Sequence, residues 1–224
     1  MIGKKENETS RTLRFVTAAS LFDGHDAAIN VIRRLIQSKG AEVVHLGHNR
    51  SVCEVVRAAI QEDVDAIAIS SYQGGHMEYF TYLLDLLKEY GAEHIKVFGG
   101  GGGTITLEEI NLLESAGVSR IYHPGHGMKM GLIGMIDDIF QIVRAGPTDK
   151  RTKICVDDHY ERYVKQDINN EIKISQTISA IENRVIPTDI LNELKIKWKE
   201  SICGTPVIGI TGTGGAGKSS VVDE

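Results

Sequence analysis

The stretch LRFVTAASLFDGHDAAINVIRRLIQSKGAEVVHLG, residues 13–47, contains the pattern that decides the fold. It begins with a short apolar run at 13–19, which is typical of a buried strand. In residues 26–40, isoleucine and leucine side chains recur on one helical face, and Gly40 provides a signal for the end of a helix. A second strand-like run follows at 41–47. Strand, helix and strand in this order predict one unit of a parallel sheet.

The same alternation continues to about residue 146. Ser51 and Glu54 have the spacing of a capping box at the start of one of the helices. Five strands alternating with five helices predict a flavodoxin-like, doubly wound parallel sheet with helices on both faces, whose ligands bind outside the carboxyl ends of the strands. The remaining strands are expected at 64–70, 94–100 and 118–125, and the remaining helices at 51–63, 76–91, 106–117 and 131–146.

The chain is expected to contain three regions. The alternating pattern defines a first domain at 12–146. Residues 147–204 are charged and helical in pattern, without alternating strands, which predicts a helical linker. A strand-like run at 206–211 then precedes a glycine-rich motif, so the start of a second domain is predicted at 205–224.

Composition limits the class of protein. The 224 residues are 42% hydrophobic and 25% charged, as in ordinary globular proteins, and the net charge of −5 argues against nucleic acid or a membrane surface as a partner. The cysteines Cys53, Cys155 and Cys203 are far apart, which favours reduced thiols over a disulfide framework. The polar amino terminus carries no secretory signal, and no run approaches the ~18 apolar residues that a membrane helix needs. We therefore expect a cytoplasmic location.

Three loops are expected to lie together at the carboxyl ends of the first, third and fourth strands. They comprise residues 21–26, 70–75 and 99–103, and the last of them consists of five consecutive glycines. Glycine loses more backbone entropy on folding than any other residue, so such a run favours a place where a phosphate or a large, flat or elongated ligand lies against the backbone. The alternative is a flexible loop without a ligand.

The first of these loops contains Asp23 and His25. A single histidine is more often a structural residue than a ligand, but a carboxylate two residues away can accept one imidazole N–H and fix the tautomer of a metal-bound histidine. No other histidine or cysteine is near in sequence, so a metal bound by His25 would arrive with its other ligands, as in a macrocycle. We expect Asp26 to cap the following helix. The spacing of His123 and His126 also admits a metal site, although a loop at the rim of the sheet is favoured.

Three short motifs resemble the signature of cobalamin-binding domains. DGHDAA at 23–28 resembles D-x-H-x-x-G, SSY at 70–72 resembles S-x-L, and GG at 99–100 resembles the G-G of the family, in the same order and with similar spacing. Two positions depart from the pattern, since Ala28 replaces the glycine and Tyr72 replaces the leucine.

The resemblance implies a role for each matching position. His25 would be the lower axial ligand of cobalt, and Asp23 would orient it. Ser70 would hydrogen-bond a buried benzimidazole, and the glycines would let the nucleotide tail pass close to the backbone. The implied cofactor-binding residues are Asp23, Gly24, His25, Ser70, Tyr72, Gly99 and Gly100.

The stretch GTGGAGKS at 212–219 fits the phosphate-loop motif G-x-x-x-x-G-K-[ST] and follows an apolar run. In such a loop, backbone N–H groups hold phosphate oxygens, Lys218 would reach the terminal phosphates, and the hydroxyl of Ser219 would ligate Mg²⁺. The motif does not distinguish guanine from adenine. The expected nucleotide-binding residues are Gly212, Gly214, Gly215, Ala216, Gly217, Lys218, Ser219 and Ser220.

A cobalamin signature followed by a phosphate loop resembles the amino-terminal portion of the fused isobutyryl-CoA mutase family. The stretches that carry this resemblance include ASLFDGHDAAINVIRRLIQ at 19–37, SSYQGGHMEYF at 70–80, FGGGGGTI at 98–105 and GLIGMIDDI at 131–139. ISQTISAIENR at 174–184 is similar to the start of the GTPases that act as chaperones for methylmalonyl-CoA mutase.

The resemblance implies an adenosylcobalamin-dependent radical isomerase that interconverts isobutyryl-CoA and n-butyryl-CoA, or a related branched acyl-CoA. It also implies a fused GTPase chaperone that uses GTP and Mg²⁺ in cofactor loading and protection. The acyl-CoA substrate would bind a domain outside this chain, the full protein would be a homodimer, and this portion alone would turn over neither acyl-CoA nor GTP. A corrinoid carrier or methyltransferase domain and a cobalamin sensor remain as alternatives.

Overall fold

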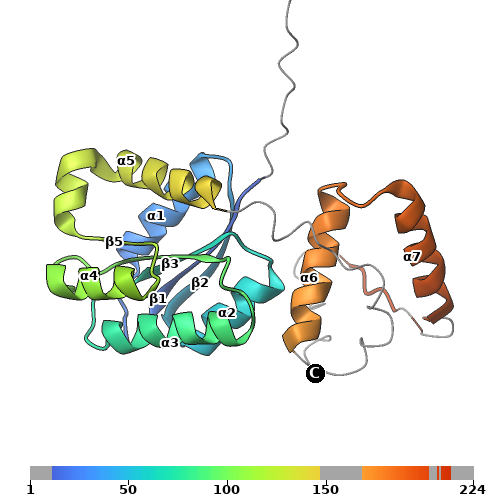
Figure 1. Ribbon diagram of the computed structural model, residues 1–224, viewed down its shortest axis with the longest axis horizontal. Helices are drawn as coiled ribbons and strands as arrows, with labels where there is room; N and C mark the ends of the chain where they lie inside the picture. The colour runs from blue at the N-terminus through green and yellow to red at the C-terminus, as the bar shows by residue number, and fades with distance from the viewer. Residues whose placement is uncertain (1–11, 147–167, 202–205, 207, 213–224) are drawn as a thin grey trace, which may run out of the picture. The chain divides into compact units, whose positions relative to one another are not determined.

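The computed structural model describes residues 12–146, 168–201, 206 and 208–212 (Figure 1). Its central element is a five-stranded parallel sheet in the order β2-β1-β3-β4-β5, which is the flavodoxin-like order predicted from the sequence. The strands are β1 (Arg14–Ser20), β2 (Glu42–Arg50), β3 (Ala66–Ser70), β4 (Lys96–Gly100) and β5 (Arg120–Tyr122). The helices are α1 (Ala27–Ser38), α2 (Val52–Gln61), α3 (His76–Glu89), α4 (Leu107–Ala116), α5 (Pro124–Ala145), α6 (Ile168–Glu182) and α7 (Thr188–Ser201).

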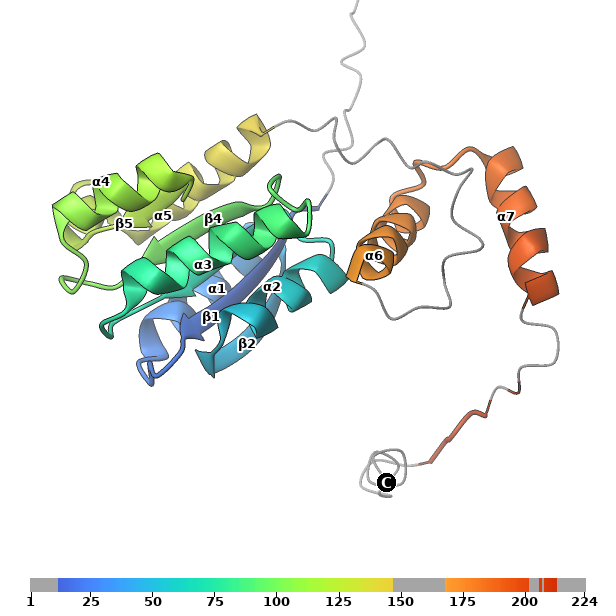
Figure 2. The ribbon, with the colours of Figure 1, turned by 60° about the horizontal axis from the view of Figure 1, so that its bottom comes forward.

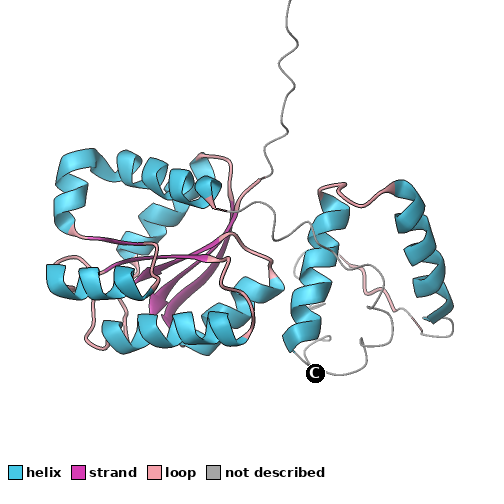
Figure 3. Cartoon of the chain, viewed as in Figure 1, coloured by secondary structure: helices cyan, strands magenta, loops and turns pink. Residues whose placement is uncertain are grey.

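Helices cover both faces of the sheet, with α1 and α5 on one face and α2, α3 and α4 on the other (Figures 1, 2 and 3). Alternate residues of each strand point to opposite faces, so Phe15 of β1 packs in the cluster under α1 and α5, whereas Val16 packs in the cluster under the other helices. Both residues are fully buried. Burial on both sides explains why the strands read as continuous apolar runs.

A side-chain cap fixes the start of α2 but not that of α1. Ser51 Oγ accepts from the backbone N–H of Glu54 at 3.3 Å, and Glu54 Oε2 accepts from the N–H of Ser51 at 2.9 Å, which confirms the predicted capping box. The expected cap at Asp26 is wrong. Asp26 occupies the N-cap position of α1 but makes no side-chain cap hydrogen bond. Its backbone is helical, with φ −89° and ψ −14°, whereas capping side chains usually reach the helix from an extended residue.

Two of the observed elements, α5 and β2, have bounds that differ from the predicted ones. Helix α5 begins at Pro124, not at residue 131, so the segment expected to be a rim loop is helical. Pro124 suits the first helical position, and a break at Gly131, where φ is +67°, separates two helical stretches. Strand β2 extends to Arg50, beyond the expected end at residue 47, and Gly47, with φ +85°, lies at an irregularity in the pairing with β1.

The chain divides into two compact units after Val185. The first unit includes α6, whose Glu171 accepts from Arg57 of α2 at 2.8 Å and whose Ser179 accepts from Arg14 of β1 at 2.8 Å. Helices α6 and α7 both fall within the segment predicted as a helical linker, and the domain boundaries themselves stay predictions.

The strand expected at 206–211 does not form in the residues that are described there, 206 and 208–211. A parallel strand needs hydrogen bonds from a neighbouring strand, and no strand of the described regions pairs with this segment. Gly212 is exposed, and the other predicted nucleotide-binding residues lie outside the described residues. Within the described parts of the chain, none of the helices has the length and apolar character to cross a membrane.

Candidate functional site

The loops that follow β1, β3 and β4 lie together at the carboxyl edge of the sheet, as the strand order requires. The backbone N–H of Tyr72 donates to Oδ2 of Asp23 at 2.7 Å, which joins the first loop to the second. The N–H of Ser71 donates to the carbonyl oxygen of Gly100 at 2.8 Å, which joins the second loop to the third. The hydroxyl of Ser20 donates to that of Ser71 at 2.9 Å.

Asp23 and His25 form a hydrogen-bonded pair in the first loop. Oδ1 of Asp23 lies 2.9 Å from Nδ1 of His25 and also accepts from the backbone N–H of His25 at 2.8 Å. A carboxylate can only accept, so in the neutral imidazole this contact selects the tautomer with the proton on Nδ1 and the lone pair on Nε2. The Asp23 side chain is fully buried, whereas that of His25 is 64% exposed. The pair therefore offers a fixed imidazole nitrogen to a metal outside the protein surface.

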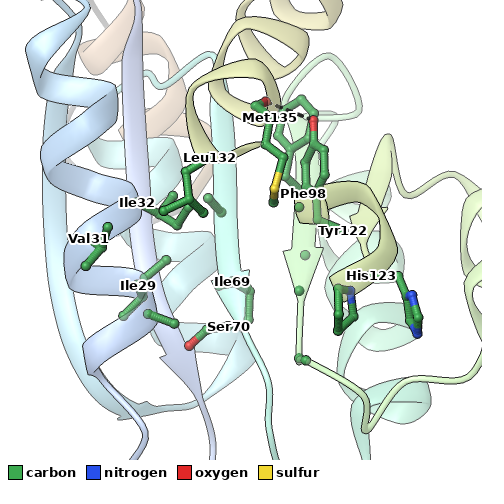
Figure 4. Close-up of a pocket in the computed structure, with 18 of the residues that line it drawn as sticks. Ile29, Val31, Ile32, Ile69, Ser70, Phe98, Tyr122, His123, Leu132 and Met135 are labelled. Atoms are coloured by element: carbon green, nitrogen blue, oxygen red, sulfur yellow. Dashed lines mark hydrogen bonds between the residues drawn. The ribbon is translucent and has the colours of Figure 1, made fainter. Parts of the chain in front are cut away.

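A cavity of about 440 Å³ lies beside this loop. Its walls come from α1 and α5 and from the carboxyl ends of β3 and β4, and Figure 4 places Ile29 and Ile32 of α1 across from Leu132 and Met135 of α5. Tyr72 also lines the cavity, and its ring centroid is 5.6 Å from that of His25. The cavity, with its largely apolar side chains, suits a flat aromatic group that reaches in from the rim occupied by His25.

Ser70 places an unsatisfied polar atom on the wall of this cavity. The residue is 6% exposed, and its Oγ is buried without a hydrogen-bond partner among the described residues. A buried hydroxyl without a partner costs about 1–3 kcal/mol, and such groups are rare in folded proteins. The position fits a ligand that brings a hydrogen-bonding atom into an otherwise apolar cavity.

The structure gives a reason for two of the consecutive glycines that differs from the one expected. A Cβ on Gly99 would lie 2.4 Å from Cζ of Phe80, and a Cβ on Gly101 would lie 1.9 Å from the carbonyl oxygen of Ser71. Close packing within the protein therefore requires both glycines, whatever binds there. Gly100 lines the cavity, and its missing side chain leaves room beside Tyr122.

Comparison with known proteins matches residues 13–132 to the B12 binding domain family. The chain belongs to this family. The matched residues include β1 to β5, α1 and the part of the α5 wall as far as Leu132.

Curated relatives extend the similarity beyond this B12-binding domain. The chain is 54% identical over 217 residues to a fused isobutyryl-CoA mutase of Cupriavidus metallidurans, which covers 95% of the chain and 18% of the relative. A protein of the same name from Geobacillus kaustophilus is 49% identical over 221 residues, with 95% and 19% coverage. The chain thus spans about a fifth of the length of these relatives.

Among solved structures, a cobalamin-binding protein from Desulfitobacterium hafniense superposes with a TM-score of 0.50 at 20% identity. The match covers 59% of this chain and 60% of that one. At this level of identity the likeness concerns the fold alone, and it agrees with the parallel sheet of the B12-binding domain.

Two features of the B12-binding domain were not predicted from the sequence. Tyr122 lines the cavity, and its hydroxyl donates to Oδ2 of Asp138 at 2.8 Å. Burial and the adjacent carboxylate raise the pKa of Tyr122 above its ordinary value, so the phenol stays neutral. The first half of α5 also contributes to the cavity, and its glycine-rich sequence resembled a loop. Pro124, which suits the first helical position, was the available signal for the earlier start, because Leu132 and Met135 lie in the helix already predicted at 131–146.

The two histidines at the start of α5 serve the helix. Nδ1 of His123 accepts from the backbone N–H of Gly125 at 3.2 Å, and Nδ1 of His126 accepts from the N–H of His123 at 3.2 Å. Within the described ranges of the chain, there is no group of three or more histidine, cysteine, aspartate or glutamate side chains that could hold a metal ion.

Proposed function

We propose that this chain is the cobalamin-binding part of an adenosylcobalamin-dependent mutase that interconverts isobutyryl-CoA and n-butyryl-CoA. The observation that carries the proposal is the Asp23–His25 pair, in which a buried carboxylate holds an exposed imidazole beside a largely apolar cavity. The relatives named fused isobutyryl-CoA mutase, at 54% and 49% identity, support the reaction and the acyl-CoA substrate.

The residues of the site fit a cobalamin bound with its lower base displaced. Nε2 of His25 would hold cobalt, and Asp23 would keep the ring in the required tautomer and orientation. Ser70 Oγ, which lacks a partner among the described residues, would hydrogen-bond the displaced benzimidazole within the cavity. Gly100 would let the nucleotide tail run close to β4.

When bound, adenosylcobalamin supplies the radical chemistry of the isomerisation through its cobalt–carbon bond. The chain's own contribution is to bind and orient. Ile29, Leu132 and Met135 would keep water from a base in the cavity, and the buried Asp23 carboxylate would strengthen the donor character of His25.

The same proposal includes a GTPase chaperone fused after this domain. Lys218 and Ser219 would hold the terminal phosphates of GTP and Mg²⁺ in a phosphate loop that begins at Gly212. The acyl-CoA would bind a further domain, and the full protein would be a homodimer. The shared name of the relatives and their much greater length support the further domains.

Titration of the purified chain with adenosylcobalamin, followed by absorption spectroscopy, tests the cofactor site. The wild-type chain should bind with the spectrum of a histidine-ligated cobalamin whose own base is displaced. His25→Ala should abolish that spectrum and weaken binding about 10- to 100-fold, whereas the exposed His48→Ala serves as a matched control without effect. An unchanged spectrum and affinity in His25→Ala would refute the proposal.

The reaction is tested in the full-length protein that contains this chain. Cobalamin-dependent conversion of isobutyryl-CoA to n-butyryl-CoA is expected. Methyl transfer from the loaded protein, without any isomerisation of acyl-CoA, would instead identify a corrinoid carrier.

A further inference from the structure

The end of β2 is irregular next to the loop that contains His25. Pairing between β1 and β2 is regular as far as Thr17 and His45, but Ala18 then pairs with Gly47 and Ser20 pairs with Arg50. The extra residues of β2 are accommodated at bulges, and Gly47 has a φ of +85°. Bulges of this kind redirect side chains and are common beside functional sites.

Asn49 lies within the second of these irregularities, between Gly47 and Arg50, and makes two hydrogen bonds to the loop after β1. Its side-chain Oδ1 accepts from the backbone N–H of Phe22 at 2.8 Å. Its own backbone N–H donates to the carbonyl oxygen of Asp23 at 3.2 Å. Asn49 therefore bridges the two residues that immediately precede the Gly24–His25 turn.

The bridged residues have backbone conformations that need support. Phe22 has a φ of +63° and Asn49 a φ of +56°, which places both in the left-handed region. Asparagine tolerates this region, but a bulky residue such as phenylalanine rarely adopts it. The Phe22 side chain is 80% exposed, so its own packing does not supply the support. The hydrogen bond that the N–H of Phe22 donates to Asn49 Oδ1 helps to offset the strain, together with the bond from the N–H of Asp23 to the carbonyl oxygen of Ser20 at 3.0 Å, which closes the turn.

Asn49 is itself held by its neighbours. The carbonyl oxygen of Arg50 accepts from the hydroxyl of Tyr79 on α3 at 3.0 Å. The guanidinium of Arg50 donates through Nε to the carbonyl oxygen of Leu46 at 2.6 Å. The strand end is thus fixed to α3, and it provides a rigid point from which Asn49 can hold the loop.

We propose that Asn49 is a positioning residue for the loop that ligates cobalt. It holds Phe22 and Asp23 in the one conformation that directs the Asp23 carboxylate at His25 and at the N–H of Tyr72. Without this bridge, Phe22 relaxes toward ordinary backbone angles, and His25 is aligned for only part of the time. The inference rests on the proposed function, because it assumes that His25 is the ligand.

Two substitutions separate the hydrogen bond from the backbone conformation. Asn49→Gly removes the acceptor but adopts a φ of +56° without strain, and Asn49 is exposed, so this variant should fold normally. Asn49→Asp keeps an oxygen at the position of Oδ1 and tolerates the same backbone. His48→Ala on the same strand end is the matched control.

The experiment is a spectroscopic titration of the full chain with adenosylcobalamin. Asn49→Gly should bind about 3- to 10-fold more weakly, as expected for the loss of one hydrogen bond, and should show a smaller histidine-ligated fraction at saturation. Asn49→Asp should restore the affinity and the histidine-ligated fraction of the wild type. A residue that served only general stability would lower the urea midpoint without changing the histidine-ligated fraction.

His25→Ala, titrated in parallel, distinguishes a failure of the positioning role from a failure of the proposed function. If His25→Ala loses the histidine-ligated spectrum while Asn49→Gly matches the wild type, the positioning role is wrong and the proposed function stands. If both variants match the wild type, the proposed function fails as well. Loss of cooperative unfolding in Asn49→Gly would also overturn the inference, because a residue that acts on one loop does not support the sheet.

Discussion

Asp23 and Tyr72 are joined by a 2.7 Å hydrogen bond in which the backbone N–H of Tyr72 donates to a fully buried carboxylate oxygen. The other oxygen of the same carboxylate accepts from His25. One side chain therefore connects the loop after β1 to the loop after β3 and also orients the imidazole. The position of the candidate ligand thus depends on the pairing of two strands as well as on its own turn.

Asp23→Asn should weaken adenosylcobalamin binding about 10- to 100-fold, because an amide cannot accept from Tyr72 and His25 with both of its atoms. The free energy of unfolding should also fall by about 1–3 kcal/mol, since a buried donor loses its partner. Spectroscopic titration and urea unfolding measure the two effects. Asp26→Asn is the matched control, because Asp26 makes no side-chain cap. Equal behaviour of the two variants would contradict the orienting role of Asp23.

Ser70→Ala should separate binding from stability. The Ser70 hydroxyl has no hydrogen-bond partner in the described residues, so its removal should leave the unfolding free energy of the free chain unchanged or raise it by up to about 1 kcal/mol. Cobalamin binding should nevertheless weaken about 3- to 10-fold through the loss of one hydrogen bond. Ser71→Ala is the contrasting variant, since it deprives Ser20 of its acceptor and should lower stability. Unaltered affinity in Ser70→Ala would remove Ser70 from the site.

Gly101→Ala should destabilise the domain by roughly 2 kcal/mol or more, because its Cβ would meet the Ser71 carbonyl oxygen at 1.9 Å and the backbone must shift. Gly103→Ala is the control within the same run of glycines. Nothing lies within 4 Å of a Cβ at that position, so the free energy of unfolding should change by no more than about 0.5 kcal/mol. Urea unfolding of both variants checks this prediction, and similar midpoints would show that close packing does not explain Gly101.

His45 should contribute to the loss of stability in mild acid. Burial and the positive charge of Arg33 lower the pKa of His45 below its ordinary value of 6.5. The unfolded chain therefore takes up a proton before the folded chain does, so stability falls as the pH drops through 6.5 and the loss ends below the folded pKa. His45→Gln should reduce this slope between about pH 7 and pH 5 in urea unfolding, by comparison with the wild type and His48→Gln. If the stability of His45→Gln depended on pH as steeply as that of the wild type, the lowered pKa of His45 would be contradicted.

Much of the fold could be predicted from local pattern. The apolar runs and the helical spacing indicated every strand and helix of the sheet, because parallel strands are buried on both faces. Helix α6 shows where this reasoning stopped. Its charged sequence predicted a helical linker, and the structure buries Ser175, Ser179 and Ala180 of this helix within the first unit while Ile174 and Ile178 are exposed. Nothing in the spacing of polar residues reveals that they form the contacting face.

The candidate site was predictable where the residues are close in sequence. Asp23 and His25 are two positions apart, and their contact follows from the turn between them. The hydrogen bonds to Tyr72 and Asn49 depend on strand pairing and on the bulge at Gly47, so they required the three-dimensional structure. The expected cap at Asp26 failed for a related reason, because a backbone angle decided it.

The contacts of the polar face of α6 also affect how readily this helix separates from the rest of the first unit. Its described contacts include the ion pair between Arg57 and Glu171 at 2.8 Å and the hydrogen bond from Arg14 to Ser179, beside the apolar contact of Ile172 with the core cluster. Dissolved salt weakens exposed ion pairs and leaves apolar packing intact. Potassium chloride should therefore speed deuterium uptake by the α6 amides while those of β1 and β3 remain protected. Helix α6 is the part of the unit that ionic strength can release.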